Sequence, residues 1–527
     1  MRQPQRTKIR AYGSLRCTSV VRGYNGSLFC RREEPHIAIL GGGITGLSAT
    51  YHLARKYPAT RITLIEGSDR AGGWLDSHRV DVGAGTVLLE KGPRTLRSSS
   101  KPALELINLL GLENELLTVA NSEPAAQTRF LYVNNSSSGL SPLPSPSSLL
   151  SFITSPVSGK IFGGLQRDFW TAYNRPNVED ESVDAFFTRR FGSEFARIFA
   201  SALVHGIYAT DSRKLSLRAA YPMLWNAEAY GSGSVVWGAL KPKPKRLVDD
   251  SSSYELGNSL PELMKNAAVY SFRGGLSTLS NALVYAIKSR NNVEIRTGDL
   301  ISSVNLGEPF RIITKSGSVV SPTHIISALP VKQLDAVLRA ADTERNDTLL
   351  TLTSSRSPES STIHVTNFIF PPSKKPLHPL GFGYLIPRPV EGYESEENSQ
   401  GMLGTIFDTV SMGRQDTADG YTKMGIISGG PYPSASTGPN VDVLLKVLRK
   451  HLGDRYELPN PIYSMTTECK ECIPLFEPGH LKWVEKLRST LKYYGENKVQ
   501  IIGAGIGGVS IPDCIEQGRS SSVEITL

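Results

Sequence analysis

This 527-residue sequence has no long apolar run, few cysteines and no excess of charge on the body of the chain. No stretch offers the roughly 18 consecutive apolar residues that a membrane-spanning helix needs, so any membrane contact is expected to be peripheral. The formal charge is +9, but eight of the 58 basic residues lie within residues 1–32, which hold no acidic residue. The remaining 50 basic residues face 49 acidic ones. This balance argues against nucleic acid as a partner of the body.

The five cysteines offer little for metal binding or redox catalysis. Cys469 and Cys472 have the spacing of a zinc knuckle, but neither a second C-x-x-C nor a histidine pair accompanies them. No metal site is therefore expected. A thioredoxin-like role would need a β-α-β setting, which the flanking Pro461 and Pro474 do not supply.

The first 32 residues form a basic leader. They are rich in arginine and hydroxyl residues, free of acidic residues, and without a continuous apolar segment. These are properties of a mitochondrial transit peptide rather than of a secretory signal. The alternative is an N-terminal extension with no targeting role.

A β-α-β pattern opens the body of the chain. HIAIL (36–40) and RITLIE (61–66) are apolar and rich in β-branched residues, and a helical pattern over 43–57 separates them. This order predicts a parallel sheet. Strands alternate with a helix again over 269–330, and a last strand is expected at 499–505. The sequence therefore predicts a mixed α/β (α+β) fold with a Rossmann-like domain assembled from discontinuous segments.

The turn after the first strand fits the dinucleotide fingerprint G-x-G-x-x-G at residues 41–46. Gly41 permits the tight turn, Gly43 lets a pyrophosphate approach the backbone, and Gly46 allows close packing of helix on strand. Glu66 follows Gly46 by 20 residues and ends the second strand, where its carboxylate can accept hydrogen bonds from ribose hydroxyls. A nucleotide site is expected here.

The stretch from Glu66 to Trp74 contains Arg70, Gly72 and Gly73 and resembles the E-x(3)-R-x-G-G motif of the flavin amine oxidase superfamily. Longer stretches, among them KGPRTLR, AAQTRFLYV, GFGYLIP and GVSIPDCIEQGR, are similar to the protoporphyrinogen oxidase family. The first resemblance implies FAD as cofactor, with the Gly72-Gly73 turn returning across its phosphates. The second covers nearly the whole body and implies one non-covalently bound FAD per chain.

The resemblance to protoporphyrinogen oxidases also implies a reaction and partners. The family oxidises protoporphyrinogen IX to protoporphyrin IX by six electrons, consumes dioxygen and releases hydrogen peroxide, in the penultimate step of haem biosynthesis. It implies a homodimer held peripherally on the mitochondrial inner membrane, on its intermembrane-space side, with hand-over of product to ferrochelatase. The implied domains are a transit peptide (1–32), FAD-binding parts (33–120, 265–310 and 491–527), a helical membrane-binding and substrate-covering region (127–245), and a substrate-binding domain (311–490).

The same resemblance assigns residues to the site. Arg129 is expected to pair with a substrate propionate, because a guanidinium fork fits a carboxylate; a surface arginine is the alternative. Phe382, Gly383 and Leu385 are expected to pack on the macrocycle, or else to form a hairpin tip. The implied cofactor-binding residues are Gly41, Gly42, Gly43, Ile44, Thr45, Gly46, Glu66, Arg70, Gly73, Trp74, Gly92, Pro93, Arg94, Thr95, Ile301, Tyr432, Val509, Ser510 and Ile511.

Three of these assignments carry qualifications. Arg94 is the only candidate for a catalytic role, as a cationic group beside the flavin, and no histidine or carboxylate general base is expected. Leu300 is an alternative to Ile301. Tyr432 and Pro512 stand where the family usually has Trp and Asn.

A second glycine turn, Gly503-x-Gly505-x-x-Gly508, follows the last expected strand. Only 19 residues remain after it, too few for a second nucleotide site. Ser510 and Asp513 predict a capping box at a helix start, with Pro512 in the first turn. We therefore expect this turn to complete the first site, and the resemblance implies that its helix faces the flavin N1–C2=O edge.

Two other kinds of protein remain as alternatives. One is another oxidase of the superfamily, such as an amine oxidase or a carotenoid desaturase, although an amine substrate would favour an aromatic cage over Arg129. The other is a GDI-like escort protein without catalysis, which a flavin absorption band of the purified protein would exclude.

Overall fold

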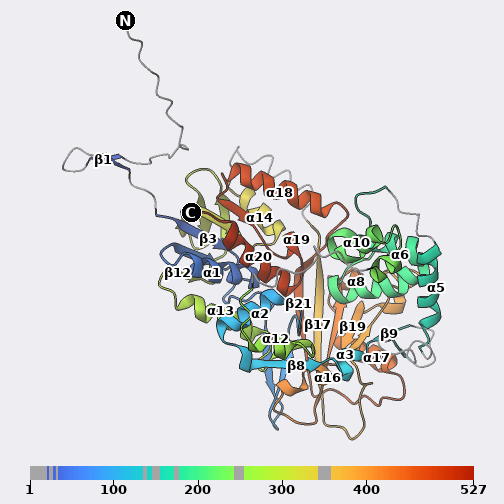
Figure 1. Ribbon diagram of the computed structural model, residues 1–527. Helices are drawn as coiled ribbons and strands as arrows, with labels where there is room; N and C mark the ends of the chain where they lie inside the picture. Colours follow the sequence, from blue (N-terminus) through green and yellow to red (C-terminus); the bar gives the residue numbers. More distant parts are fainter. Residues whose placement is uncertain are drawn as a thin grey trace.

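The computed structural model describes residues 20–22, 28–30, 34–133, 139–144, 155–170, 177–241, 254–341 and 358–527 (Figure 1). Most of the expected transit peptide lies outside these ranges. Within it, β1 (Val20–Arg22) and β2 (Leu28–Cys30) pair in antiparallel fashion. The targeting role of residues 1–32 stays a prediction.

A five-stranded parallel sheet forms the centre of one half of the molecule. Its strand order is β12 (Val293–Arg296), β4 (Arg61–Ile65), β3 (His36–Leu40), β16 (His324–Ser327) and β22 (Val499–Ile501). The strands come from distant parts of the chain, as expected for a discontinuous domain. The range expected for the substrate-binding domain, 311–490, contains β16, which instead pairs with β3 in this sheet. That boundary needs correction, because the pairing partner of a short apolar strand is set only by the folded chain.

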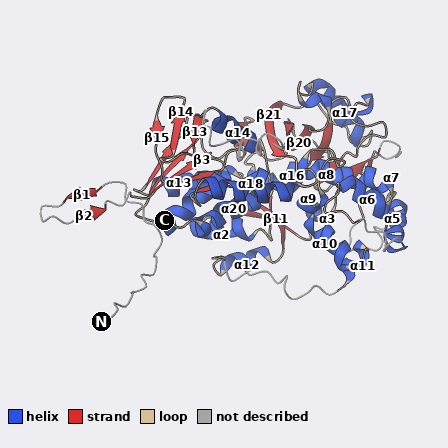
Figure 2. Ribbon diagram, turned by 90° about the horizontal axis from the view of Figure 1, so that it is seen from above, coloured by secondary structure: helices blue, strands red, loops and turns tan. Residues whose placement is uncertain are grey.

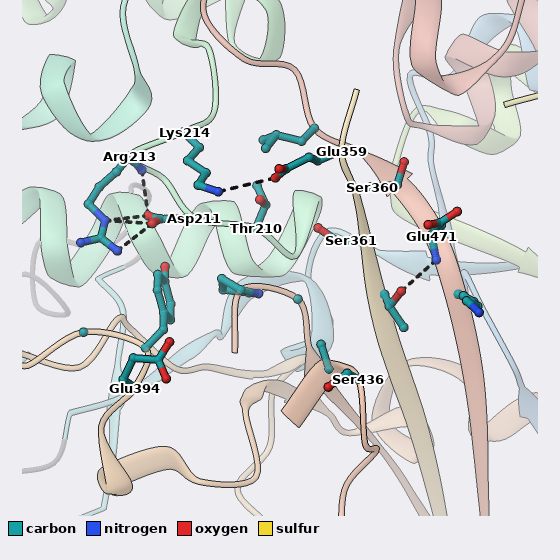
Figure 3. A pocket seen from close by; sticks show the side chains of 18 of the residues that line it. Thr210, Asp211, Arg213, Lys214, Glu359, Ser360, Ser361, Glu394, Ser436 and Glu471 are labelled. Atoms are coloured by element: carbon teal, nitrogen blue, oxygen red, sulfur yellow. Dashed lines mark hydrogen bonds and ion pairs between the residues drawn. The ribbon is translucent and has the colours of Figure 1, made fainter. Parts of the chain in front are cut away.

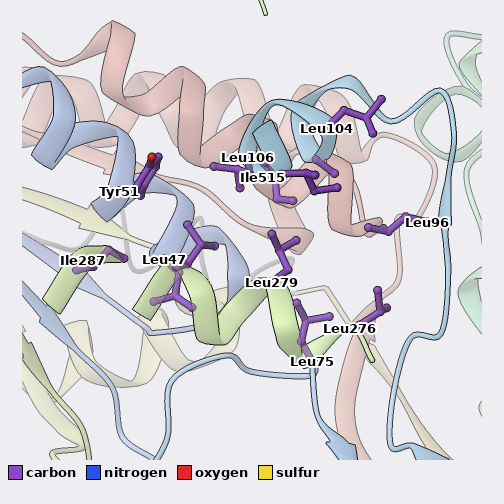
Figure 4. Close-up of a cluster of buried hydrophobic side chains, with 14 of the residues drawn as sticks. Leu47, Tyr51, Leu75, Leu96, Leu104, Leu106, Leu276, Leu279, Ile287 and Ile515 are labelled. Atoms are coloured by element: carbon purple, nitrogen blue, oxygen red, sulfur yellow. The ribbon is translucent and has the colours of Figure 1, made fainter. Parts of the chain in front are cut away.

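The first and last long segments of the chain share one core. Helix α1 (Ile44–Lys56) packs against α20 (Ile511–Glu524), and Ser48 Oγ donates to the Ile515 carbonyl at 2.9 Å. Figure 4 shows Leu47 and Tyr51 of α1 near Ile515, with Leu279 of α13 (Ser277–Lys288) in the same cluster. Helix α2 (Lys101–Leu110) contributes further apolar side chains to this cluster.

A seven-stranded sheet forms the second half. Its order is β10 (Leu140–Pro142), β9 (Phe130–Tyr132), β18 (Gly383–Leu385), β19 (Met402–Ile406), β20 (Thr422–Gly429), β17 (Ser360–Phe370) and β21 (Tyr463–Pro474). All neighbours are antiparallel except β9 and β18, which are parallel. Strands β9 and β10 fall within 127–245, the range expected to be helical. The β9–β18 pairing joins this segment to the sheet, so the helical region proper begins later.

The helical region lies at the end of the molecule away from β13–β15, as Figure 2 shows. It contains α5 (Ser158–Trp170), α6 (Val183–Phe191), α7 (Ser193–Phe195), a π-helix (Ala196–Ala200), α8 (Ser201–Tyr208), α9 (Leu217–Ala220), α10 (Pro222–Tyr230) and α11 (Val235–Leu240). Phe187, Phe191, Phe195 and Phe199 recur at helical spacing, with successive ring centroids 5.4, 5.0 and 4.7 Å apart. This aromatic row gives the region its own core.

Smaller elements connect these parts. The strands are β5 (Ser77–Asp81) with β6 (Thr86–Glu90); β7 (Leu96–Arg97), β11 (Ala267–Phe272) and β8 (Leu116–Ala120); and β13 (Ile301–Asn305), β14 (Arg311–Thr314) and β15 (Val319–Val320). The helices are α3 (Pro124–Gln127), α12 (Ser259–Met264), α14 (Val331–Arg339), α16 (Asp408–Met412), α17 (Val441–Leu452), α18 (His480–Tyr494) and α19 (Ala504–Gly507). Short 3-10 turns lie at Glu113–Glu115, Glu396–Asn398, Gly413–Gln415 and Pro433–Ala435. Among the described residues, no helix is both long and apolar enough to cross a membrane.

Candidate cofactor and substrate site

The fingerprint turn between β3 and α1 has the geometry that its glycines predict. A Cβ placed on Gly46 would lie 1.9 Å from the Gly41 carbonyl oxygen, so only glycine permits this approach of helix to turn. A Cβ placed on Gly43 would meet no protein atom within 4 Å. Gly43 is the N-cap of α1 and offers no capping side chain. The first amides of α1 therefore face open space, which suits a pyrophosphate.

The second glycine turn packs directly on the first. The Gly72 amide donates to the Gly42 carbonyl at 2.8 Å, and Gly43 and Gly72 form an isolated parallel bridge. Arg70 donates to the Gly73 carbonyl at 2.7 Å and to the Leu75 carbonyl at 3.1 Å. Arg70 thus braces the turn, while its side chain stays partly exposed.

Glu66 ends β4 beside these turns. One carboxylate oxygen accepts from the Gly42 amide at 2.6 Å, and the other accepts from the Ser68 amide and hydroxyl at 2.9 and 2.6 Å. Leu300 is 45% exposed and lies against Gly67, whereas Ile301 is 7% exposed and packs into the core. Of these two, Leu300 is therefore the side chain that lies against the residue following Glu66. The ribose role of Glu66 stays a prediction.

Arg94 is turned into the protein rather than toward an open site. Its Nε donates to Asp408 of α16 at 3.1 Å, and its two Nη atoms donate to Asn367 of β17 at 3.0 Å and to the Gly92 carbonyl at 3.3 Å. The side chains of Arg94 and Asp408 are only 6% and 9% exposed. This arrangement favours a positioning role for Arg94 over the chemical role expected from the sequence. Trp74, in contrast, is 47% exposed.

The C-terminal glycine turn lies next to the fingerprint. Strand β22 pairs with β16, which pairs with β3. The Ala328 carbonyl oxygen lies 3.2 Å from a Cβ placed on Gly41 and 3.7 Å from one placed on Gly503. The predicted capping box is present: Ser510 Oγ accepts from the Asp513 amide, and Asp513 accepts from the Ser510 amide, both at 3.2 Å. The two turns therefore share one edge of the sheet.

The residues expected to bind substrate gather between β9, β18 and α8. The Arg129 guanidinium lies 5.7 Å from the centre of the Phe382 ring, and the Phe382 amide donates to the Thr128 carbonyl at 2.9 Å. Leu385 lies against Gly206 of α8. The Arg129 residue is exposed, yet desolvation of its guanidinium, followed by repulsion from Arg97, lowers its pKa. Arg97 was not assigned from the sequence, although KGPRTLR places it three residues after Arg94.

The remaining assigned residues have mixed surroundings. Val509 packs against the apolar cluster of the helical region, which brings the C-terminal turn close to that region. Tyr432 is buried with Tyr393, Leu403 and Ala209, and its ring lies 5.0 Å from that of Tyr393. That cluster contains none of the other residues assigned to the cofactor.

A separate pocket of about 840 Å³ lies where the helical region meets the ends of β17 and β21 (Figure 3). Its walls are charged, and Asp211 pairs with Arg213 at 2.7 Å and Lys214 with Glu359 at 3.5 Å. None of the residues assigned from the sequence lines it. In the part of the chain that the structure describes, no cluster of histidine, cysteine or carboxylate side chains could hold a metal ion.

Because Glu90 is buried, we expect the free energy of unfolding to depend on pH. Desolvation raises its pKa from 4.5 to about 7, although it accepts hydrogen bonds from the Leu276 amide at 2.8 Å and the Ser77 hydroxyl at 2.7 Å. Between about pH 4.5 and 7, Glu90 therefore keeps its proton in the folded chain and has lost it in the unfolded chain. This contribution to the free energy of unfolding is complete below about pH 4.5 and is lost as the pH rises through about 7, by up to about 3 kcal/mol.

Urea unfolding at pH 5 and pH 7.5 tests this, with Glu90→Gln as the comparison. The parent chain is expected to lose more stability than the variant over this range. Taking the difference cancels buried histidines such as His52, whose lowered pKa of about 4 acts in the opposite direction. An identical loss in both proteins would contradict the assignment.

Comparison with known proteins agrees with this geometry. Residues 44–526 match the family model described as flavin containing amine oxidoreductase. The chain is 30% identical to the protoporphyrinogen oxidase of Homo sapiens over 498 residues, covering 93% of this chain and 98% of that protein. It is 25% identical to the coproporphyrinogen III oxidase of Bacillus subtilis over 508 residues, covering 93% and 97%.

A solved structure supports the fold. The crystal structure of a protein from Exiguobacterium, provisionally named a protoporphyrinogen oxidase, superposes with a TM-score of 0.69 at 18% identity, covering 93% of this chain and 99% of that one. The predicted fold class and the resemblance found in the sequence are both confirmed. Since the family model spans nearly the whole body, the chain belongs to the flavin containing amine oxidoreductase family and is a flavin-dependent oxidoreductase.

Proposed function

We propose that this chain binds one FAD non-covalently and oxidises protoporphyrinogen IX to protoporphyrin IX, consuming dioxygen and releasing hydrogen peroxide. The observation that carries the proposal is that residues assigned to the cofactor and residues assigned to the substrate lie close together. The segment Gly92–Thr95, assigned to the cofactor, leads directly to Arg97, whose charge acts on Arg129 beside Phe382. The named relatives support the same substrate.

The chain's own residues would bind and orient this substrate. Two propionates are its only charges, and Arg129 can hold one of them bidentately. Phe382 and Leu385 offer an apolar wall for the flat macrocycle. When bound, FAD supplies the redox chemistry by accepting electrons from the substrate and passing them to dioxygen.

Anaerobic mixing with protoporphyrinogen IX tests the proposal. The flavin absorption band is expected to bleach and to return on admission of air, with hydrogen peroxide formed. A flavin that stays oxidised would contradict the proposal. Coproporphyrinogen III is the informative competitor, because some relatives are named for it. Faster bleaching with coproporphyrinogen III than with protoporphyrinogen IX would indicate that coproporphyrinogen III is the substrate.

Arg129→Ala is expected to raise KM by about ten- to a hundredfold, because a hydrogen bond to a charged group contributes about 1.5–3 kcal/mol. Arg129→Lys should recover part of the loss, since it keeps the charge but not the fork. Flavin content should be unchanged in both. Arg488→Ala, an exposed arginine on α18, is the control. A KM unaffected by Arg129→Ala would place Arg129 outside the substrate site.

Exposed apolar side chains support peripheral membrane association through the helical region. On α5, Phe162, Phe169 and Trp170 are 63%, 50% and 80% exposed. Trp237 of α11 lies 6.3 Å from Phe169, and Leu240 is 72% exposed. Aromatic and aliphatic side chains of this kind insert into the lipid interface. We propose the mitochondrial inner membrane, on its intermembrane-space side, as the location, with a homodimer that hands product to ferrochelatase.

Trp170→Asp is expected to reduce co-sedimentation with phospholipid vesicles, because a charge cannot enter the apolar part of the interface without a large penalty. Tyr285→Asp is the matched control, since Tyr285 is also 80% exposed but lies on α13 in the other half of the molecule. Equal binding of both variants and the parent chain would exclude α5 from the contact.

A further inference from the structure

Cys469 and Cys472 lie on a bulged part of β21. In a regular strand, side chains three residues apart point to opposite faces. Here Cys469 pairs with Ile363 and Ile473 pairs with Ser361, so β21 has two more residues than β17 over this stretch. Glu471, in the bulge, has a φ of +48°. The bulge turns Cys472 toward the apolar cluster that contains Cys469.

The two cysteines differ in pKa. Interaction with the Cys472 side chain and the positive charge of Arg94 lower the pKa of Cys469, against the effect of burial. Interaction with Cys469 and burial raise the pKa of Cys472. Cys469 Sγ also donates to the Lys91 carbonyl at 3.6 Å, and Cys472 Sγ donates to the Ser361 carbonyl at 3.5 Å. Both sulfurs thus act as protonated donors, and Cys469 has the lower pKa of the two. Cys469 is therefore the sulfur expected to ionise and attack, with Cys472 as the resolving thiol.

The bulge borders the charged pocket of Figure 3. The two residues between the cysteines, Lys470 and Glu471, line that pocket. The Glu471 amide donates to Thr362 Oγ1 at 3.0 Å, which holds the bulge against β17. Cys469 is buried and Cys472 is half-buried, and neither lines the pocket itself. The two cysteines thus flank the two residues that form this part of the pocket wall.

We propose that Cys469 and Cys472 form a peroxide-sensitive dithiol that closes to a disulfide. The Cys469 thiolate attacks one oxygen of hydrogen peroxide, the O–O bond breaks, and, with the proton that the thiol released on ionisation returned to the leaving hydroxide, a sulfenic acid and one water form. Cys472 sulfur then attacks the sulfenic sulfur, the S–O bond breaks, and a second water leaves. Two thiols are oxidised by two electrons, and one peroxide is reduced to two waters. The source of peroxide rests on the proposed function.

Closure would act on the cofactor segment. The contact of Cys469 Sγ with the Lys91 carbonyl ties β21 to the residue that precedes Gly92, the start of the segment assigned to the cofactor. Forming the disulfide removes the thiol proton that this contact uses. Oxidation is therefore expected to weaken flavin retention, and reduction with dithiothreitol is expected to restore it.

The test is to treat the full-length flavoprotein with added hydrogen peroxide, without substrate, then alkylate the remaining thiols and digest with trypsin. Because Lys470 separates the cysteines, cleavage after it leaves two peptides joined only by the disulfide. The expected result is this linked pair, formed before Cys514 reacts and released by dithiothreitol. Cys514 is the internal reference, since burial raises its pKa to about 11. Separate, fully alkylated peptides would overturn the proposal.

Cys472→Ser provides a second measurement. Without the resolving thiol, Cys469 is expected to accumulate as sulfenic acid, which dimedone labels, and no linked pair should form. Absence of label on Cys469 in the folded variant would overturn the assigned order of attack. Because the peroxide is added, this test is independent of the proposed oxidase reaction. If the linked peptides form but the flavin does not bleach with protoporphyrinogen IX, the dithiol proposal is supported and the proposed function is contradicted.

Discussion

Gly43→Ala is expected to fold like the parent chain and to lose most of its flavin, whereas Gly46→Ala is expected to fold poorly. A Cβ on Gly43 enters space that no protein atom occupies within 4 Å, where the cofactor's pyrophosphate is expected. A Cβ on Gly46 would lie 1.9 Å from the Gly41 carbonyl oxygen. Separating α1 from its turn should cost at least about 4 kcal/mol, the range of severe packing defects.

Two readouts separate these effects. The flavin-to-protein absorbance ratio should fall in Gly43→Ala, while urea unfolding of the apoprotein should match that of the parent apoprotein. Gly163→Ala on α5 is the control, because its Cβ also meets nothing within 4 Å but lies in the helical region. It should keep its flavin and gain about 0.5–1 kcal/mol in helix stability. Full flavin content in Gly43→Ala would place the pyrophosphate elsewhere.

Arg94→Met is expected to destabilise the fold by about 3–5 kcal/mol, because it leaves the Asp408 carboxylate buried without its partner. The loss has little to do with chemistry at the flavin, since Arg94 contacts Asp408 and Asn367 instead. Adding Asp408→Leu should recover part of the stability. Replacing both partners of a buried ion pair by apolar residues destabilises a fold less than removing one partner and leaving the other charge unpaired.

The matched control is Arg55→Met, which breaks the exposed pair of Arg55 with Glu255 at 2.8 Å. It should cost less than about 1 kcal/mol. Unfolding free energies from urea titration give all three values. If Arg94→Met proved as stable as the parent, retained flavin and yet lost turnover, the chemical role expected from the sequence would be restored.

Local motifs were predictable because each depends on residues a few positions apart. The fingerprint turn at 41–46 needs only a strand, three glycines and a helix start, and the structure has all of them. The capping box of Ser510 and Asp513 spans three residues and was also found as predicted. The C-terminal glycine turn was expected to complete the first site, because the short remainder left no room for a second one, and the structure has both turns at one edge of the same sheet.

Other features needed partners that are distant in the chain. Arg94 looks like a flavin-side cation until Asp408 and Asn367, 314 and 273 residues away, surround it. The segment containing β9 was expected to be helical, but it joins a sheet through β18, some 250 residues further along. Cys469 and Cys472 have the spacing of a zinc knuckle in the sequence, but the bulge against β17 brings both into one apolar cluster instead.

The sequence by itself therefore determined the family and the Rossmann-like unit, because glycine turns, strand ends and caps are local and their order along the chain is direct evidence of such a unit. Only the tertiary structure decided which charged side chains are buried and paired inside the protein and which face a site. Burial and pairing depend on contacts between remote segments, and a charge's role follows from what surrounds it rather than from its neighbours in the chain.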